Sequence, residues 1–516
     1  MVPPKALDPG TALALIPMPI LGAVRWSSQG VFGEPAESFT APSVMAASPP
    51  LLATTKHAFP GLLANWVSPP GSQRMAPGPQ RLIAALRGAG QPACSAELAE
   101  QPITVAYLFT TFPKTSEAFL QRDVAAMQAR GVNLRLYSLW GGGGRFRGTP
   151  VQTLPRWWFF AALLWWIPYE AARRPDLLWE LIVNTLGRRA PSALNFWENM
   201  LGAGFAACFV HSFRRDPPNL VYAVWTGAPA TAAWLIWRLT GIPYGTGAHA
   251  YDLYEHGGDW WLMEKLALAR FVHTSTEMGR RTLVERGADA AKVTVIRRGL
   301  ETFPALKPLR APRRPLRLVC VARLVPKKGL RVQLKVYAAL RTAGLDFEAR
   351  LVGRGELRVE LERAVAELGL ARRVTFTGEV LPAEVWEHLG WADVLLHTGV
   401  VSPTGDRDGL PNAIAEAMAV GTLVLTSSTA AATEAIQDEA TGLVVDVNRP
   451  EDWVAALRRL AEDDALAERL RAAARRWAEE NYDAHRNAAQ LHACFAQALR
   501  GEAPRPPANL ATEAGP

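Results

Sequence analysis

The chain has 516 residues, of which 49% are hydrophobic and 20% charged, so it is long enough for two or three globular domains with a substantial core. Its 56 Lys and Arg residues outweigh 48 Asp and Glu residues, a balance that suits phosphate-bearing ligands or an anionic membrane surface and carries no nucleic-acid signature. The four cysteines lie far apart, in neither zinc-ligand nor disulfide-framework spacing, which favours a reducing, cytoplasmic location.

The first hundred residues are rich in Pro, Ala, Ser and Gly and show no sustained periodicity. We therefore expect residues 1–100 to form a disordered leader. An apolar run at 11–24 could belong to a signal peptide, but two prolines interrupt it, so secretion is the weaker interpretation. A translation start nearer Met75 is a further alternative.

From residue 103 onward, short β-branched runs alternate with helix-length segments, which is typical of parallel sheets covered by helices. We expect an α/β fold with two doubly wound, Rossmann-like domains at 101–300 and 315–480, joined by a proline-containing linker at 301–314. Ligands of such sheets bind at the strand ends, here in a central cleft. A long helical region at 451–500 should close the second domain, with a C-terminal helix at 481–502 and a disordered tail at 503–516. The predicted strands are 103–109, 133–139, 220–224, 243–248, 271–275 and 293–297 in the first domain, and 316–322, 347–352, 374–377, 394–398, 422–426 and 443–445 in the second.

In the first domain, a polar segment follows the opening strand and precedes a helix, at the edge of the sheet where ligands bind. Its hydroxyl residues could simply cap that helix. His249 lies at another junction of strand and loop, beside two glycines. A single histidine is more often structural, but this location favours a functional role. The candidates in the polar segment are Thr111, Lys114, Thr115, Ser116 and Glu117.

In the second domain, the strand at 316–322 leads into a basic loop that contains Arg323 and Lys328. Cations at the start of a helix are repelled by the positive end of the helix dipole. A diphosphate bound there would offset this repulsion, because both side chains could donate charge-assisted hydrogen bonds to it. The alternative is a solvated basic loop. Gly353, in the turn after the next strand, is a weaker candidate for the site, because two glycines at a strand end often form only a turn.

The most informative segment begins at Asp408 and predicts a helix that starts at Pro411 and carries Glu416. Proline suits the first turn and leaves the amides of Asn412 and Ala413 free for an oxygen-rich ligand. The helix is apolar nearly all round, so we expect Glu416 to be buried. Sugar or ribose hydroxyls would then supply the donors that a buried carboxylate needs. A surface Glu and a turn-capping Asp are the alternative.

Four segments, in this order, resemble the family-four (group 1) retaining glycosyltransferases of GT-B fold, and the resemblance spans roughly 103–500. Within that family the chain looks most like enzymes that build bacterial capsule or extracellular polysaccharide. The resemblance implies a nucleotide-diphospho-sugar donor, a lipid-linked or saccharide acceptor, retention of anomeric configuration, and no metal or other cofactor. The segments are Phe-Pro-Lys-Thr-Ser-Glu at 112–117, Ala-His-Ala-Tyr-Asp at 248–252, Val-Ala-Arg-Leu-Val-Pro-Lys-Lys-Gly at 321–329 and Asp-Gly-Leu-Pro-Asn-Ala-Ile-Ala-Glu at 408–416.

The resemblance also implies roles for these residues. Glu416 would hold the ribose hydroxyls, and Asp408 would stabilise positive charge at the anomeric carbon. Arg323 and Lys328 would neutralise the departing diphosphate, while His249 would meet the sugar from the first domain. The polar segment at 111–117 would lie on the acceptor side. The remaining donor-binding residues would be Gly409, Leu410, Pro411, Asn412, Ala413, Gly353 and Thr377.

Two departures from the family pattern leave alternatives open. The family usually has Glu where this chain has Asp408, which shortens the reach by about 1.5 Å; either the loop shifts or activity is reduced. Trp225 follows a valine where many relatives have a histidine, so that part of the acceptor wall is undefined. A catalytically silent nucleotide-sugar binder, or a scaffold of a polysaccharide assembly complex, is therefore the competing hypothesis. The chain has no G-x-G-x-x-G after its first strand, which argues against a dinucleotide oxidoreductase.

Asp406 and Asp408 also spell the acid-x-acid pattern that holds a divalent metal in other glycosyltransferases, although the nearby cations make a metal unnecessary. A tryptophan-rich run at 157–167, flanked by arginines, is too short to cross a bilayer. We expect the segment 156–174 to lie on an anionic membrane, at the inner face of the plasma membrane, and to present a lipid-linked acceptor. A pair of core helices is the alternative.

Overall fold

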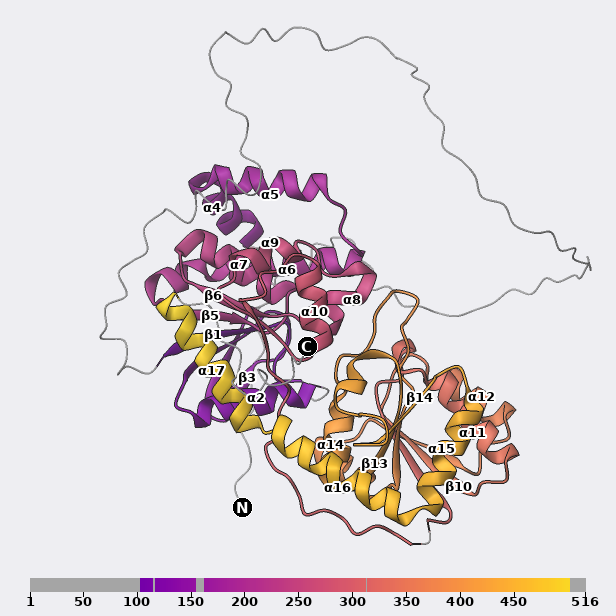
Figure 1. The fold of residues 1–516 in the computed structure, drawn as a ribbon. Helices are drawn as coiled ribbons and strands as arrows, with labels where there is room; N and C mark the ends of the chain where they lie inside the picture. Colours follow the sequence, from indigo (N-terminus) through magenta and orange to yellow (C-terminus); the bar gives the residue numbers. More distant parts are fainter. Residues whose placement is uncertain (1–102, 115–116, 155–161, 312, 502–516) are drawn as a thin grey trace, which may run out of the picture. The chain divides into compact units, whose positions relative to one another are not determined.

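The structure, a computed structural model, describes residues 103–114, 117–154, 162–311 and 313–501 (Figure 1). The predicted leader, the predicted tail beyond 501, Thr115 and Ser116 lie outside these ranges, as does 156–161 of the predicted membrane segment.

The first sheet has eight strands in the order β3-β4-β2-β1-β5-β6-β7-β8. Every pair is parallel except β3 with β4. All six strands predicted for this domain are present, with ends within two residues of the predicted ones. The short β3 and β4 were not predicted, because a glycine-rich loop and a proline mask their periodicity. The bounds are β1 Thr104–Phe109, β2 Asn133–Ser138, β3 Gly144–Phe146, β4 Thr149–Thr153, β5 Leu220–Ala223, β6 Tyr244–Gly247, β7 Val272–Thr274 and β8 Val293–Val295.

Both faces of this sheet are covered, as a parallel sheet requires. Alternate residues of β1 point into two cores: Ala106 and Leu108 join one cluster, and Val105 and Tyr107 join the other. The first cluster is completed by α6, α7 and α9, and the second by α2 and α17. The helices of this domain are α2 Ala118–Ala129, α4 Ile167–Arg173, α5 Pro175–Gly187, α6 Ala193–Arg215, α7 Ala228–Thr240, α8 Ala250–Tyr254, α9 Leu262–Leu268 and α10 Glu277–Glu285, with a π-helical turn η3 Ala162–Trp166 and a 3-10 turn η4 Glu255–Gly257.

The second sheet is fully parallel, in the order β11-β10-β9-β12-β13-β14. Its six strands were all predicted, again within two residues at each end. Leu318 of β9 belongs to the core under α11, α12 and α15, whereas Val319 belongs to the core under α13 and α14. The bounds are β9 Leu316–Val321, β10 Phe347–Val352, β11 Val374–Gly378, β12 Val394–His397, β13 Leu423–Ser427, β14 Leu443–Val445, α11 Leu330–Thr342, α12 Arg358–Glu367, α13 Pro382–Trp391, α14 Asn412–Val420, η5 Pro326–Lys328 and η6 Ala430–Glu434.

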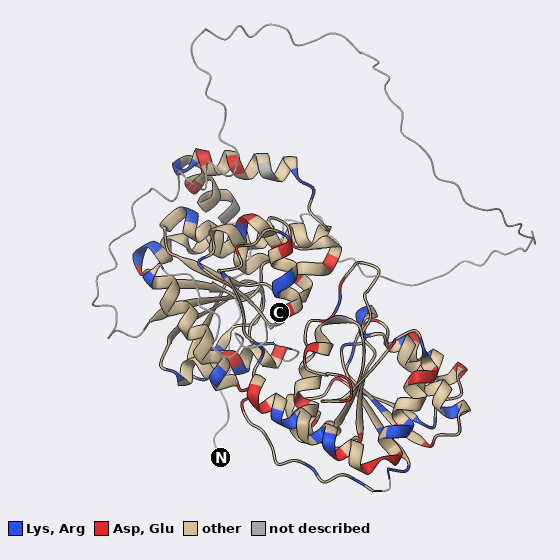
Figure 2. Ribbon diagram, viewed as in Figure 1, with Lys and Arg blue, Asp and Glu red and all other residues tan. Residues whose placement is uncertain are grey.

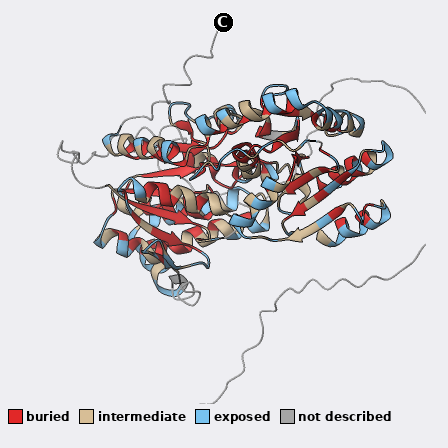
Figure 3. Ribbon diagram, turned by 90° about the horizontal axis from the view of Figure 1, so that it is seen from below, coloured by how far each residue is buried: buried red, intermediate tan, exposed pale blue. Residues whose placement is uncertain are grey.

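The C-terminal helical region differs from the expectation that it closes the second domain. It consists of α15 Pro450–Glu462, α16 Asp464–Asn481 and α17 Ala484–Arg500. The last of these helices packs its apolar face, including Leu491 and Phe495, into the core under the first sheet. The reason is visible in the sequence, because this helix carries its own strong apolar stripe and needs a second surface to cover it. Figure 3 shows the strands mainly as buried and the outer sides of the helices as exposed.

Candidate functional site

A pocket opens where β9 and β12 end and α14 begins, which is the edge of a parallel sheet where ligands bind. Sequence analysis placed the acidic and basic candidates at this edge, and the structure brings several of them together here. The pocket is lined by Cys320, Val321, Ala322, Lys328, Leu395, Leu396, His397, Thr398, Pro411, Ala413 and Ile414.

Asp408 is buried and contacts two side chains that line this pocket. Its Oδ2 accepts a hydrogen bond from Lys328 Nζ at 2.7 Å and lies 3.1 Å from His397 Nε2. The other ring nitrogen of His397 lies 2.9 Å from Thr426 Oγ1, which orients the imidazole. Asp408 is only 6% exposed, so two cationic or polar partners compensate its loss of water. An aspartate at position 408, although shorter than the glutamate that is usual in the family, is thus long enough to contact both Lys328 and His397.

The surroundings of Asp408 keep it ionised. Burial alone would raise the pKa of this carboxyl group, but Lys328, His397 and Lys327 outweigh that effect and hold the pKa well below its ordinary value. The site consequently presents a permanent negative charge next to a lysine ammonium group. Such an arrangement can stabilise opposite charges that develop on two neighbouring atoms of one ligand.

A second lysine pairs with the other acid of the loop. Lys327 Nζ lies 2.6 Å from Asp406 Oδ2, so consecutive lysines bind the two carboxylates of the acid-x-acid pattern. Within the described ranges, no group of three or more His, Cys, Asp or Glu side chains has the geometry of a metal site. Each of the two carboxylates therefore has a lysine ammonium group as its counter-charge.

Two glycines allow the loops to come this close. Gly329 has φ +64°, and a Cβ there would lie 1.8 Å from the carbonyl oxygen of Thr398. Gly353 has φ +134°, and its Cβ would lie 2.0 Å from the carbonyl oxygen of Ala322. Backbone therefore packs on backbone at both positions, which only glycine permits. Gly353 supports the loop after β9, and its position gives a structural reason for its presence besides a ligand.

The start of α14 agrees with the sequence prediction, one residue later than expected. Pro411 precedes the helix, and its carbonyl oxygen accepts from the amide of Ile414. The amides of Asn412 and Ala413 have no hydrogen-bond partner among the described residues. Since Pro411 and Ala413 both line the pocket, the partial positive charge of the helix start faces it.

Glu416 is partly buried, as predicted, but a protein group satisfies it. Its Oε1 accepts from Arg122 NH2 of α2 at 2.9 Å, and its side chain is 13% exposed. Burial raises the pKa of Glu416, and the guanidinium of Arg122 opposes that rise only in part. Glu416 therefore does not depend on a ligand for a hydrogen-bond donor, contrary to the expectation from the sequence. A carboxylate with one charged partner at its Oε1 can still accept further hydroxyls.

His249 is a neutral, buried histidine at the end of β6. Arg298 NH2 lies 2.8 Å from its Nε2, and because a guanidinium can only donate, the ring proton must sit on Nδ1. Burial, Arg298 and His273 together hold the pKa of His249 well below its ordinary value. The Nδ1 atom is buried without a hydrogen-bond partner in the described structure. Trp225 packs edge-on against this ring, with centroids 5.0 Å apart.

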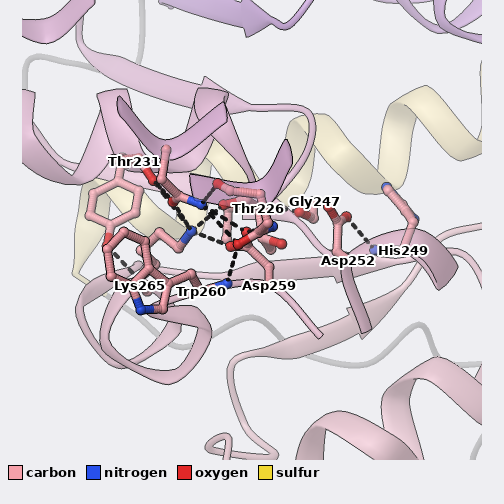
Figure 4. Close-up of polar contacts among 12 residues, drawn as sticks. Thr226, Thr231, Gly247, His249, Asp252, Asp259, Trp260 and Lys265 are labelled. Carbon is pink, nitrogen blue, oxygen red and sulfur yellow. Dashed lines mark hydrogen bonds and ion pairs between the residues drawn. The ribbon is translucent and has the colours of Figure 1, made fainter. Parts of the chain in front are cut away.

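A buried polar cluster supports this end of the first sheet (Figure 4). Lys265 is completely buried, pairs with Asp259, and donates to the carbonyl oxygen of Thr226 at 2.5 Å. Asp252 accepts from the backbone amide of His249 at 2.9 Å, and burial raises the pKa of Asp252 to about 7. The cluster thus fixes the loop after β5 beside the loop that carries His249.

The remaining described residues predicted from the sequence do not line the pocket. Arg323 is exposed, and its side chain has no partner among the described residues. Lys114 and Glu117 pair with each other at 2.7 Å on the surface, and Thr111 donates to the carbonyl oxygen of Trp140. Thr377 donates to the neighbouring carbonyl of Gly378. Gly409 and Leu410 lie half-buried between Asp408 and Pro411, and a Cβ on Gly409 would lie 3.5 Å from Ala250 of the first domain.

Three residues of the site were missed by sequence analysis: His397, Arg122 and Arg298. His397 ends a predicted strand at the ligand-binding edge, so its position could have identified it. Arg122 and Arg298 gave no local signal, because each is defined by a partner more than 40 residues away in the sequence. Only tertiary structure reveals such contacts.

Part of the chain matches a known family of enzymes. A family model of the glycosyl transferases group 1 matches residues 305–477. The amylovoran biosynthesis glycosyltransferase AmsK of Erwinia amylovora is 33% identical over 204 residues, which cover 39% of this chain and 50% of that protein. WcaL of Escherichia coli (strain K12), by name a colanic acid biosynthesis glycosyltransferase, is 26% identical over 385 residues, which cover 69% of this chain and 89% of that protein. The chain is therefore similar to the group 1 glycosyltransferases, and the match to the family model lies within residues 305–477.

Solved structures identify the fold of the chain. The Anabaena protein HepE in complex with UDP and glucose matches with a TM-score of 0.56 at 16% identity, covering 76% of this chain and 98% of that one. Sucrose-phosphate synthase of Thermosynechococcus elongatus matches with a TM-score of 0.57 at 15% identity, covering 78% and 100%. At such identities the likeness concerns the fold alone, and it confirms the predicted GT-B architecture.

Proposed function

We propose that this chain is a group 1 glycosyltransferase, which moves a sugar from a nucleotide-diphospho-sugar to a lipid-linked or saccharide acceptor with retention of anomeric configuration. The observation that carries the proposal is the pocket at the end of β9 and β12, where Lys328, Asp408 and the free amides of α14 converge. Opposite charges held next to each other suit a reaction in which a sugar becomes positive as its diphosphate leaves.

Each charged side chain has a task in this proposal. Lys328 and the exposed Arg323 neutralise the departing diphosphate, and the amides of Asn412 and Ala413 bind sugar hydroxyls or phosphate oxygens. Asp408, which stays ionised, stabilises the positive anomeric carbon. The acceptor approaches on the face that the diphosphate vacates, so the configuration is retained without a nucleophile from the protein. No metal is needed, since Lys327 and Lys328 already neutralise both acids.

Two further residues complete the donor site. The carboxylate of Glu416 accepts hydrogen bonds from the ribose hydroxyls, and Arg122 keeps this carboxylate oriented. His249 meets the sugar with its Nδ1 proton, the buried donor that has no partner in the described structure. The UDP and glucose of HepE support a nucleotide-sugar donor by analogy of fold.

We further propose that the reaction serves extracellular polysaccharide or cell-envelope glycan synthesis, on the cytoplasmic side of the membrane. The names of AmsK and WcaL support the pathway class. Cys208, Cys320 and Cys494 are free thiols, which suits a reducing compartment. The polar segment at 111–117 lies on the acceptor side in this proposal.

A panel of nucleotide sugars in a thermal-shift assay tests the donor site. A donor at 100 times its Kd should stabilise the protein by about 2.7 kcal/mol. The variant Glu416→Ala should lose this response, whereas Glu360→Ala, on an exposed helix surface, should keep it. Donor hydrolysis or transfer by the same sample separates an enzyme from a silent binder. Binding without either reaction would contradict the proposed activity.

A further inference from the structure

The helix α5 carries an exposed apolar face that the fold does not cover. Leu178, Trp179, Ile182, Val183 and Leu186 are all exposed, Trp179 at 68% and Leu186 at 82%. Their spacing of one and four residues places them on one side of the helix. We call these five residues the α5 face. Soluble proteins rarely expose so many large apolar side chains together.

The opposite side of α5 is firmly attached to the domain. Leu177 is 4% exposed and belongs to the core of the first domain, and Leu181 packs against that core. Glu180 forms a bidentate ion pair with Arg238 of α7, with distances of 3.0 and 2.7 Å. The α5 face is therefore presented by an anchored helix, and its exposure is not the result of a loosely held segment.

Charge at both ends of α5 favours an anionic partner. The acids Asp176 and Glu180 are already neutralised by arginines of the protein. Arg173 precedes the helix and Arg189 follows it, and neither has a carboxylate partner among the described residues. Figure 2 shows α5 as mostly uncharged, with Lys or Arg at its two ends. Basic ends around an apolar face are typical of helices that lie in the headgroup region of anionic membranes.

We propose that the α5 face docks onto an anionic lipid bilayer, with Trp179 at the interface and Arg173 and Arg189 among the headgroups. With 13 residues, α5 is about 20 Å long, too short for the roughly 30 Å hydrocarbon core. Among the described residues, no helix combines the length and apolarity needed to cross a bilayer. The helix lies on the membrane.

This docking surface differs from the segment 156–174 expected from sequence. The described part of that segment contributes Leu164 and Trp165, which are 82% and 68% exposed, but the larger apolar face is the later helix. Leu194 and Trp197 at the start of α6 are also exposed. The sequence prediction concentrated on tryptophan density, whereas α5 contains only one tryptophan among aliphatic side chains. The proposal gives a lipid-linked acceptor a route to the enzyme, and in that respect it rests on the proposed function.

Vesicle sedimentation of the full chain tests the proposal directly. The protein should bind vesicles of phosphatidylcholine with phosphatidylglycerol, and bind pure phosphatidylcholine less. The double variant Trp179→Ser with Leu186→Ser should lower the partition coefficient at least about tenfold. The matched control is Val359→Ser with Leu381→Ser, which removes two side chains of similar exposure, 66% and 63%, from the second domain. It should bind like the wild type.

Three outcomes would overturn the proposal. Equal binding by the α5 variant and the control would exclude the α5 face. Failure of the wild-type chain to bind any vesicle would exclude a lipid bilayer as the partner of the α5 face. A dimer in sedimentation equilibrium that the α5 variant dissociates, without vesicle binding, would identify a second copy as the partner. Quenching of tryptophan fluorescence by brominated lipid, reduced in Trp179→Phe, is the independent measurement. None of these assays uses sugar transfer, so they can fail while the proposed activity stands.

Discussion

Lys328 Nζ and Asp408 Oδ2 lie 2.7 Å apart although 80 positions separate the two residues in the sequence. One follows β9 and the other precedes α14, so the parallel order of the second sheet brings both to the same edge. A phosphate oxygen that approaches Lys328 must compete with Asp408 for its ammonium protons. We therefore expect donor binding to lengthen or break this ion pair and to release Asp408 for the sugar.

The first prediction concerns the charge of Asp408. The variant Asp408→Asn keeps the shape of the side chain and removes its negative charge, so kcat should fall by about 10² to 10³. Donor affinity should change less, because the diphosphate still meets Lys328. Steady-state kinetics with an active donor measures both quantities. An unchanged kcat would show that Asp408 only orients Lys328.

A second prediction follows from the pairing of Arg298 with His249. Because the pKa of His249 is depressed by burial, Arg298 and His273, the ring stays neutral in the wild type, and kcat/KM should show no ionisation of His249 near the ordinary histidine pKa of 6.5. In Arg298→Met one positive charge is gone, so the pKa of His249 should rise and kcat/KM should fall on the acid side.

The double variant Arg298→Met with His249→Gln is the control for that profile. It has no imidazole at this position, so kcat/KM should be low at every pH and should no longer fall on the acid side. If the limb persists in the double variant, another group is responsible and the assignment to His249 is wrong.

The third prediction tests the contact between α2 and α14. Removing Arg122 leaves Glu416 partly buried without its charged donor, so Arg122→Met should lower stability by about 1–3 kcal/mol at neutral pH. The pKa of Glu416 is raised, so folding favours its protonated form, and stability falls as pH rises through the folded pKa. Without Arg122 this pKa rises further, and the loss in Tm should be larger at pH 8 than at pH 5.

Arg331→Met serves as its control, since Arg331 pairs with Glu360 on an exposed surface. Its effect on Tm should be small and should not grow with pH. A loss in Arg122→Met that is equal at both pH values would mean that the contact matters through packing and not through charge.

The strands were predictable because parallel strands buried on both faces leave apolar runs in the sequence, and β5, with its four buried residues Leu-Val-Tyr-Ala, is such a run. The start of α14 was predictable as well, since proline and the two free amides depend on local sequence only. The roles of Arg122 and Arg298 were not predictable, because they depend on where distant elements meet. The packing of α17 against the first domain was missed for the same reason. The apolar stripe of an amphipathic helix shows that one face will be buried, but the sequence does not show which domain buries it.

The last prediction concerns the close approach at Gly329. Both Gly329 and Gly344 have positive φ, +64° and +71°, so alanine at either position pays about 1–2 kcal/mol for the left-handed backbone. At Gly344 a Cβ meets nothing within 4 Å, whereas at Gly329 it would lie 1.8 Å from the Thr398 carbonyl oxygen. Gly329→Ala should therefore lower Tm clearly more than Gly344→Ala, and it should also weaken donor binding, because the loop that moves carries Lys328. Equal losses in Tm would show that the backbone of Thr398 yields without cost. A Gly329→Ala variant with wild-type donor affinity would show that this loop does not position Lys328.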